Sequence, residues 1–205
     1  MPVAYLATRV TKCTKDDLVK LGRLMRYVRE TRDREIVLRA GAAGIEVRVY
    51  IDAAYGVHAD GKSHTGSCVV IGELGAVHCK STKQQIVSKS STEAELIALS
   101  DSANQALHTR KFLLAQGYMC GPAIVYQDNL SCMALIERGR SGAERTRHIG
   151  VRYFWLKETV ESGEAIIRHM GTLKMYANLL TKPLQGGQFV SEREALTGWD
   201  KKILA

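Results

Sequence analysis

The stretch IEVRVYID, residues 45–52, decides the fold. Its apolar side chains alternate with polar or mixed ones, which is the pattern of a half-buried β-strand. The next stretch, GVHADGKSHTG at 56–66, is turn material in which Asp60-Gly61 is a favourable hairpin dipeptide. Two further strand patterns follow at 67–71 and 76–80. The sequence therefore predicts three consecutive antiparallel strands.

Beyond these strands, helical and strand patterns alternate. They predict, in order, a helix over 91–115, a strand over 123–127, helices over 129–137 and 149–161, a strand over 164–169 and a helix over 173–180. The resulting order, β-β-β-α-β-α-α-β-α, predicts an α/β fold with a mixed five-stranded sheet flanked by helices. This is also the order of the ribonuclease H fold. Because one fold hosts many functions, the function has to be argued from the site.

The segments on either side of this core, which spans 45–185, differ from it. Residues 1–44 predict a basic helical segment with Thr14 as N-cap and a glycine-rich linker at its end. Residues 186–205 predict a polar, loosely ordered tail. The helix carries apolar and basic residues on opposite faces: Leu18, Leu21, Met25 and Val28 against Lys20, Arg23, Arg26 and Arg29. The basic face is either solvated or phosphate-binding.

The composition limits the class of protein. Of the 205 residues, 45% are hydrophobic and 24% are charged, which indicates a globular chain. The sequence has neither a long apolar run nor a signal-peptide pattern, so we expect no membrane contact. Five cysteines without a CxxC pair indicate reduced thiols and argue against a zinc site. The net charge of +8 favours a polyanionic partner, although it could also serve solubility alone.

Two acidic residues lie at the ends of predicted central strands. Asp52 follows Ile51 directly, and Asp128 follows the strand 123–127. An unpaired buried charge is costly, so acids in such places need a partner, and carboxylate oxygens suit Mg²⁺ and Mn²⁺. Taken singly, each acid could instead belong to a turn or cap a helix, as Asp128 could before 129–137.

The helix start SSTEAELIALS, residues 90–100, offers a third carboxylate. Glu93 lies three residues after Ser90, which fits a capping box and gives Glu93 a structural role. Glu95 begins the helix face that Ala98 continues, so it is expected to point toward the sheet. Glu95 is therefore the preferred metal ligand and Glu93 the alternative.

Five motifs now occur in a recognisable order. They are DAAYG at 52–56, SKSSTEAELIAL at 88–99, YQDN at 126–129, RTRHIGVRYFWLKE at 145–158 and ANLLTKPL at 177–184. In this order they resemble the ribonuclease H domain of copia-type LTR retrotransposon reverse transcriptases. Residues 5–31 resemble the connection region that precedes this domain in the polyprotein. The resemblance covers residues 5 to 185, and it is specific because of the number and order of the motifs.

The resemblance implies an enzyme that hydrolyses the RNA strand of RNA–DNA hybrids by a two-metal mechanism. Its site would consist of Asp52, Glu95, Asp128 and, at the fourth position, Asn178. The implied cofactor is Mg²⁺, two ions, with Mn²⁺ able to substitute. The implied partners are an RNA–DNA hybrid and the polymerase part of the polyprotein. The implied location is cytoplasmic, in a virus-like particle, or nuclear.

Further residues are expected to contact the substrate. Lys83, Gln84 and Ser91 precede or begin a helix, where free backbone N–H groups attract phosphate, although a polar loop with ordinary capping is the alternative. Asn129, Arg147 and His148 lie in the other motifs and are expected to face the hybrid. His169, near the end of the last strand, is either a general acid/base or a core or edge histidine.

The sequence departs from the family pattern at the fourth position. Asn178 stands where the family has Asp, and an amide oxygen can ligate a metal but brings no negative charge. Gly150 also replaces an acid. The alternative function is therefore a weakened or inactive module that binds hybrids. A transposase or integrase fits less well, because those enzymes take their glutamate from a late helix, whereas Glu95 lies between Asp52 and Asp128.

Overall fold

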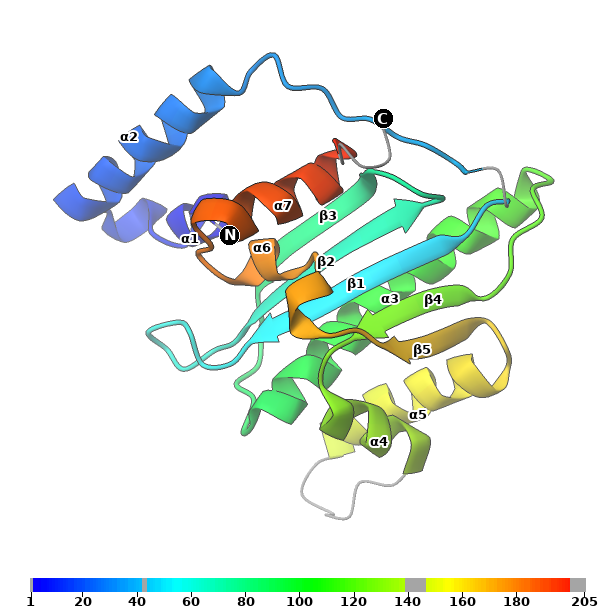
Figure 1. Cartoon of the computed structure of the whole chain (residues 1–205). Coiled ribbons are helices and arrows are strands. Elements are labelled where there is room, and N and C mark those ends of the chain that lie inside the picture. Colours follow the sequence, from blue (N-terminus) through cyan, green and yellow to red (C-terminus); the bar gives the residue numbers. More distant parts are fainter. Residues whose placement is uncertain (1, 42–43, 139–146, 200–205) are drawn as a thin grey trace.

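A mixed five-stranded sheet forms the centre of the molecule (Figure 1). The computed structural model describes residues 2–41, 44–138 and 147–199, without the side chains of 147–149 and 153. The strands lie in the order β3-β2-β1-β4-β5. They are β1 (Val47–Ala54), β2 (His64–Ile71), β3 (Ala76–Lys83), β4 (Ala123–Gln127) and β5 (Ala165–His169). The pairs β1–β2 and β2–β3 are antiparallel, and β1–β4 and β4–β5 are parallel. The predicted sheet is confirmed.

Helices cover both faces of this sheet (Figure 1). One face carries α3 (Ser91–Ala115), α4 (Leu130–Arg138) and α5 (Arg147–Glu161). The other carries η3 (Thr172–Lys174), α6 (Asn178–Thr181) and α7 (Gly186–Thr197). The N-terminal helices are α1 (Pro2–Ala7), η1 (Val10–Lys12) and α2 (Lys15–Glu30), of which α2 lies beside α7. Within the described ranges, no helix is both long and apolar enough to cross a bilayer.

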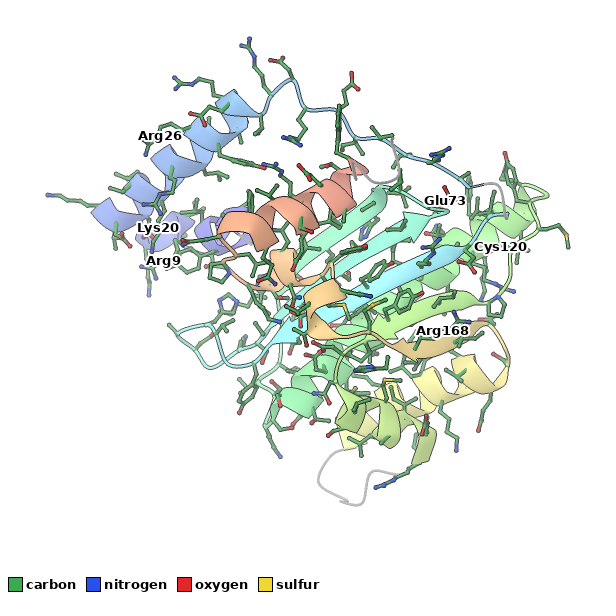
Figure 2. All side chains as sticks on the ribbon, viewed as in Figure 1. Arg9, Lys20, Arg26, Glu73, Cys120 and Arg168 are labelled. Atoms are coloured by element: carbon green, nitrogen blue, oxygen red, sulfur yellow. The ribbon has the colours of Figure 1, made fainter. Side chains whose placement is uncertain are left out.

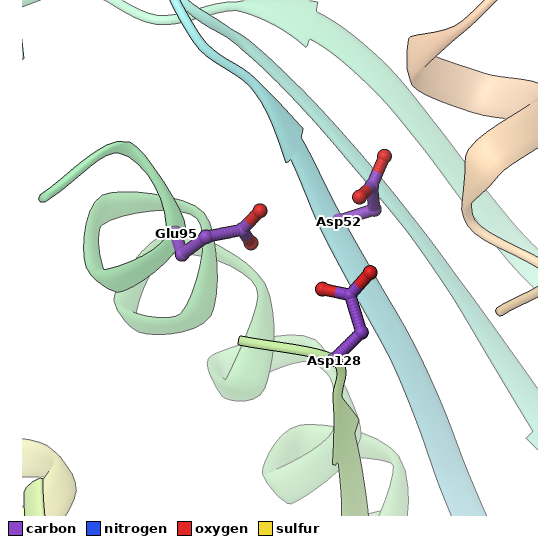
Figure 3. A group of neighbouring side chains, drawn as sticks. All are labelled: Asp52, Glu95 and Asp128. Atoms are coloured by element: carbon purple, nitrogen blue, oxygen red, sulfur yellow. The ribbon is translucent and has the colours of Figure 1, made fainter. Parts of the chain in front are cut away.

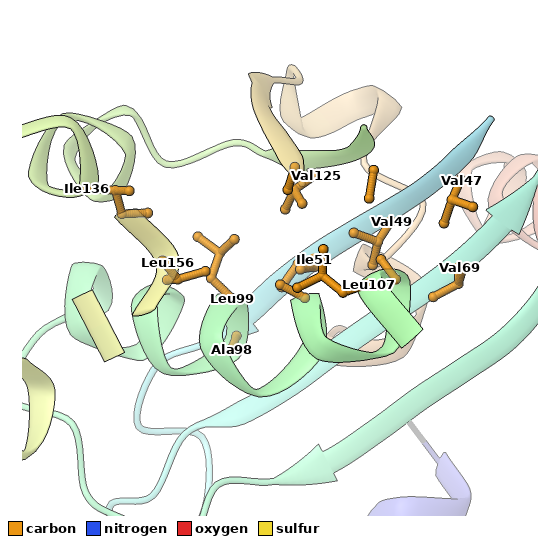
Figure 4. Close-up of a cluster of buried hydrophobic side chains, with 14 of the residues drawn as sticks. Val47, Val49, Ile51, Val69, Ala98, Leu99, Leu107, Val125, Ile136 and Leu156 are labelled. Atoms are coloured by element: carbon orange, nitrogen blue, oxygen red, sulfur yellow. The ribbon is translucent and has the colours of Figure 1, made fainter. Parts of the chain in front are cut away.

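The alternation in β1 divides the core between the two faces. Val47, Val49 and Ile51 are fully buried and pack against α3, where Leu99 meets them (Figure 4). Tyr50 points to the opposite face, where its ring stacks on that of Tyr126, with the ring centroids 4.9 Å apart. Asp52 is the next residue on the Tyr50 side, so the strand period aims its carboxylate toward α6.

Two predictions near the C-terminus are wrong. The helix expected over 173–180 is instead the short η3 and the single turn α6. The tail beyond Gly186, expected to be loosely ordered, forms the helix α7. Glu192 and Leu196 of α7 are buried, and Leu196 joins the core on that face of the sheet. The helix is ordered by packing on α6 and the sheet, which its own polar, glycine-rich composition did not reveal.

Helix α2 begins as predicted but turns the unexpected face outward. Thr14 Oγ1 accepts from the backbone N–H of Asp17, and the Asp17 carboxylate accepts from that of Thr14, which completes a capping box. Tyr27 meets Phe189 of α7 edge to face. The apolar face is 42–59% exposed: Leu18, Leu21, Met25 and Val28. Of the basic residues, Lys20 and Arg23 line a groove against α7. Figure 2 shows the side chains of Lys20 and Arg26 on this helix.

The segment between α2 and β1 crosses the end of α7. Val37 donates its backbone N–H to the carbonyl of Thr197 over 2.8 Å, and the Trp199 indole donates to the carbonyl of Glu35 over 2.8 Å. Arg39 forms an isolated antiparallel bridge with Leu74 in the β2–β3 turn. This segment, residues 35–39, therefore straps the N-terminal helices to the C-terminal half of the domain.

Candidate metal centre

Three acidic side chains from different elements meet at one end of the sheet. Asp52 comes from β1, Glu95 from α3 and Asp128 from the residue after β4, and Figure 3 shows the three side chains as neighbours. Each offers a carboxylate oxygen, and these oxygens all lie within 4.8 Å of one another. Asp52 and Glu95 are buried. The structure thus brings together the three acids that the sequence singled out.

The helix start separates the roles of the two glutamates as expected. Ser90 Oγ caps α3 by accepting from the backbone N–H of Glu93 over 3.1 Å. The Glu93 carboxylate accepts from the backbone N–H of Lys89 over 2.7 Å, so Glu93 stays at the helix end. Glu95 Oε1 instead reaches across to β1 and accepts from the backbone N–H of Ala53 over 3.2 Å. Glu95, and not Glu93, is therefore the helix residue in the acid cluster.

Gln127, which was not among the residues predicted from the sequence, orders the centre of the cluster. The side chain is fully buried, and its Nε2 donates to Glu95 Oε2 over 3.2 Å. Its Oε1 accepts from the backbone N–H groups of Asp128 and Asn129, over 2.8 and 3.0 Å. One amide thus fixes both the Glu95 carboxylate and the turn that carries Asp128. The signal in the sequence that could have indicated this role is the position of Gln127 directly before Asp128.

Asp128 does not cap the following helix. Asn129 Oδ1 accepts from the backbone N–H of Cys132 over 2.9 Å and so satisfies the start of α4. Asp128 Oδ2 accepts instead from the Thr172 hydroxyl over 2.9 Å. The capping alternative for Asp128 is therefore wrong, and its carboxylate is left for the cluster.

The fourth predicted position, Asn178, lies beside the cluster on the α6 side. Its side chain is fully buried, and its Nδ2 donates to the carbonyl of Thr172 over 2.6 Å. Its Oδ1 accepts from Lys182 Nζ, and the same ammonium donates to Asp52 Oδ1 over 3.2 Å. Thr181 Oγ1 donates to the second oxygen of Asp52. Asn178 is thus joined to Asp52 through Lys182, a contact that the residue type at 178 alone could not predict.

The approach of α6 to Asp52 depends on Gly66, which pairs with Asp52 across β1 and β2. A Cβ at this glycine would lie 2.7 Å from Thr181 Cγ2 and 2.9 Å from the carbonyl oxygen of Ala177. Real Cβ atoms do not tolerate such contacts, so only glycine allows the turn to pack here. The side chains of Thr181 and Lys182 reach Asp52 as a result.

The electrostatics of the cluster favour a bound cation. Burial, together with the charges of Asp52 and Asp128, raises the pKa of Glu95 to about 8. Burial also raises the pKa of Asp52, against the opposing effects of Lys182 and Thr181. Carboxylates that repel one another in a buried place are stabilised by a cation between them, and oxygen donors suit Mg²⁺ and Mn²⁺. The residues present therefore fit a divalent metal.

The residues predicted to contact the substrate differ in burial and in their partners. Gln84 is buried, with its Nε2 bonded to Thr65 Oγ1 and the Ala94 carbonyl, which does not favour its predicted contact with the substrate. Lys83 pairs with Asp60 over 2.7 Å. Ser91 is exposed at the first residue of α3 and remains a predicted phosphate contact. Asn129 is half-buried and caps α4.

Three predicted residues remain: Arg147, His148 and His169. The side chains of Arg147 and His148 fall outside the described part of the chain, although α5 begins at Arg147. His169 is exposed at the end of the edge strand β5, and in the parallel register it lies beside Gln127. Its place at the edge matches the simpler alternative, and its part in catalysis stays a prediction.

Comparisons with known proteins find relatives of this chain. The chain is 27% identical over 192 residues to the retrovirus-related Pol polyprotein from transposon RE1 of Arabidopsis thaliana, covering 91% of this chain and 13% of that polyprotein. It is 28% identical over 166 residues to that from transposon TNT 1-94 of Nicotiana tabacum, covering 81% of this chain and 12% of the relative. The chain thus spans about an eighth of these relatives.

Among solved structures, LC11-RNase H1 isolated from compost superimposes with a TM-score of 0.51 at 15% identity, covering 78% of this chain and 99% of that one. No protein-family model matches the chain. The relatives confirm the resemblance to retrotransposon Pol polyproteins that the five motifs indicated. The solved structure confirms the fold.

Proposed function

Starting from a chain homologous to transposon Pol polyproteins and folded like ribonuclease H, we propose that it hydrolyses the RNA strand of RNA–DNA hybrids in a metal-dependent reaction. The observation that carries this proposal is the meeting of Asp52, Glu95 and Asp128 within 4.8 Å from three separate elements. A purely structural role for three acids at one point would be costly, because their charges repel without a cation.

The residues around the cluster hold the carboxylates in place for their task. Glu95 is held by Gln127 and by the backbone of β1, and Asp128 by Thr172. These bonds set the carboxylates in position in advance, which lowers the cost of arranging them when a cation binds. Bound divalent cations would activate a water and offset charge on the scissile phosphate.

The substrate would be recognised by its shape and charge. The net charge of +8 suits a polyanion, and RNA in a hybrid is distinguished by its 2′-hydroxyls. Ser91 begins the helix whose second turn carries Glu95, so a phosphate at this N-terminus would lie close to the metal ligands. In the polyprotein, the polymerase part would deliver the hybrid, in a virus-like particle or in the nucleus.

Hybrid cleavage with a labelled RNA strand tests the function. We expect cutting that requires Mg²⁺ or Mn²⁺ and that Asp52→Asn and Glu95→Gln abolish while hybrid binding is kept. Glu93→Gln is the matched control, because it makes the same change two residues earlier on α3, outside the cluster. Cleavage that survives Asp52→Asn would rule out the metal role.

A hybrid-binding module without activity is the second candidate, and Asn178 is the observation that favours it. The fourth carboxylate is missing, and an ammonium lies between Asn178 and Asp52. Hybrid binding without cleavage at any tested concentration of Mg²⁺ or Mn²⁺ would establish this alternative.

A further inference from the structure

We propose that the ammonium of Lys182 takes the place of a second divalent cation in this chain, so that the acid cluster binds one divalent ion beside it. The proposal deepens the nuclease function and rests on it, because it concerns the same acids. It differs from the two-ion site that the resemblance implies.

The Lys182 ammonium lies between Asp52 and Asn178. Lys182 Nζ lies 3.2 Å from Asp52 Oδ1 and also donates to Asn178 Oδ1. An aspartate at position 178 would offer this point two carboxylates, one from β1 and one from α6, which is a site for a cation. With Asn178 in that place, a single positive charge is sufficient, and Lys182 supplies it.

The Lys182 ammonium also contributes to the balance of charge at the acid cluster. Asp52, Glu95 and Asp128 carry three negative charges when all are ionised. One divalent cation together with the Lys182 ammonium balances them. A second divalent cation would leave an excess of two positive charges next to a buried carboxylate, which electrostatic repulsion opposes.

Lys182 is held in place, and is not a freely moving surface lysine. The turn that carries it is fixed from the α7 side by the buried Glu192, whose Oε2 accepts from the backbone N–H of Leu179 over 2.8 Å. It is fixed from the sheet side by Ser81, whose hydroxyl donates to the Leu180 carbonyl over 2.7 Å.

The backbone of Lys182 itself is also restricted. It is extended, with ψ near 144°, and the next residue, Pro183, disfavours a helical conformation at this position. The Cα–Cβ bond of Lys182 therefore leaves the end of α6 in a set direction.

Lys182 and the divalent ion would therefore have different chemical roles. An ammonium provides positive charge and three N–H donors but no open coordination position. Lys182 can therefore hold Asp52 and attract an oxygen of the substrate phosphate, whereas activation of water is left to the single divalent ion.

Counting bound Mn²⁺ tests the proposal without reference to activity. A titration followed by the EPR signal of free Mn²⁺ should give one ion per unmodified chain. The double variant Asn178→Asp/Lys182→Met restores the acid and removes the ammonium, so it should bind two. Lys174→Met, an exposed lysine of the neighbouring η3, is the control and should leave the number at one. Two ions on the unmodified chain, or one on a folded double variant, would overturn the proposal.

A second measurement needs no variant and so does not depend on folding. Acetylation by acetic anhydride, followed by peptide mass mapping, should modify Lys182 several-fold more slowly than Lys174, also at saturating Mg²⁺. If Mg²⁺ raises the rate at Lys182 to that at Lys174, a divalent ion displaces the ammonium and the proposal is wrong.

The two proposals fail in different ways. One bound ion with a protected Lys182, but no hybrid cleavage, would contradict the nuclease and keep the assignment of the lysine. Hybrid cleavage with two bound ions on the unmodified chain would do the reverse. Binding of no Mn²⁺ at all would contradict both.

Discussion

Gln127 Nε2 donates to Glu95 Oε2 over 3.2 Å, so a side chain at the end of β4 sets the direction of the carboxylate that α3 brings to the site. The same amide accepts two backbone N–H groups through its Oε1. The buried Gln127 therefore connects two of the three acids through protein contacts alone.

We expect Gln127→Met to loosen the metal site and to destabilise the fold. The substitution leaves two backbone N–H groups without their acceptor, at a cost of about 1–3 kcal/mol in the free energy of unfolding. Mn²⁺ affinity should fall several-fold, because the Glu95 carboxylate loses its donor. Chemical denaturation and an Mn²⁺ titration measure the two effects. Gln116→Met, at the exposed C-cap of α3, is the control; equal Mn²⁺ affinities in the two variants would contradict the role of Gln127.

The stability of the metal-free protein should decrease as the pH rises. The pKa of Glu95 is about 8 in the folded chain against an ordinary value of 4.5, so the folded state binds this proton more tightly than the unfolded state. Between these two values, each rise in pH therefore costs the folded state stability, up to about 5 kcal/mol in all.

Denaturation at several pH values, with EDTA, measures this effect of pH. Glu95→Gln should flatten the profile, and saturating Mg²⁺ should do so in the unmodified protein. An identical pH profile for the Glu95→Gln variant would show that Glu95 does not titrate in this window.

Gly66→Ala should displace α6 from Asp52. The new methyl group would lie 2.7 Å from Thr181 Cγ2, so the turn has to move, at a cost of about 1–3 kcal/mol in stability. Hybrid cleavage should fall at least tenfold, because Thr181 and Lys182 lose their contacts with Asp52. Gly22→Ala is the matched control: no atom lies within 4 Å of its added Cβ, and in the middle of α2 it should stabilise by roughly 0.5–1 kcal/mol. A fully active Gly66→Ala variant would mean that these contacts are dispensable.

Asn178→Asp should destabilise the metal-free protein. The Asn178 amide donates to the Thr172 carbonyl over 2.6 Å, and a carboxylate cannot donate there when ionised. The loss of this buried bond should lower the free energy of unfolding by about 1–3 kcal/mol. Added Mg²⁺ should raise the free energy of unfolding of the variant by more than it raises that of the unmodified chain. Thermal unfolding with and without Mg²⁺ gives the comparison, and equal stabilisation of both proteins by Mg²⁺ would show that position 178 does not reach the ion.

The sequence predicted the elements and acids that depend on local pattern. Asp52 was found because it ends a strand directly after an apolar residue, and Glu95 because the helical period after Ser90 turns it toward the sheet. Asp128 was found because it directly follows an apolar strand. These three are confirmed as neighbours.

The features that the sequence did not predict depend on contacts between distant residues. Lys182 meets Asp52 across 130 positions of the chain, and the amide of Gln127 meets Glu95 across 32. Helix α7 is ordered by what it packs on, and Gln84 is buried by bonds to β2 and α3. Local pattern carries no information about such pairs, so a polar segment or a loop glutamine is easily assigned to the surface.

The strap formed by residues 35–39 decides where the domain can be cut. A fragment that began at Ile45 would keep all five strands, yet it would leave the Thr197 carbonyl and the Trp199 indole without their partners at the end of α7. Helix α7 carries Glu192, which holds the turn before Lys182, so trimming the upstream chain would weaken an anchor of that turn. We therefore expect a stable fragment to start before the first strand, near Glu35.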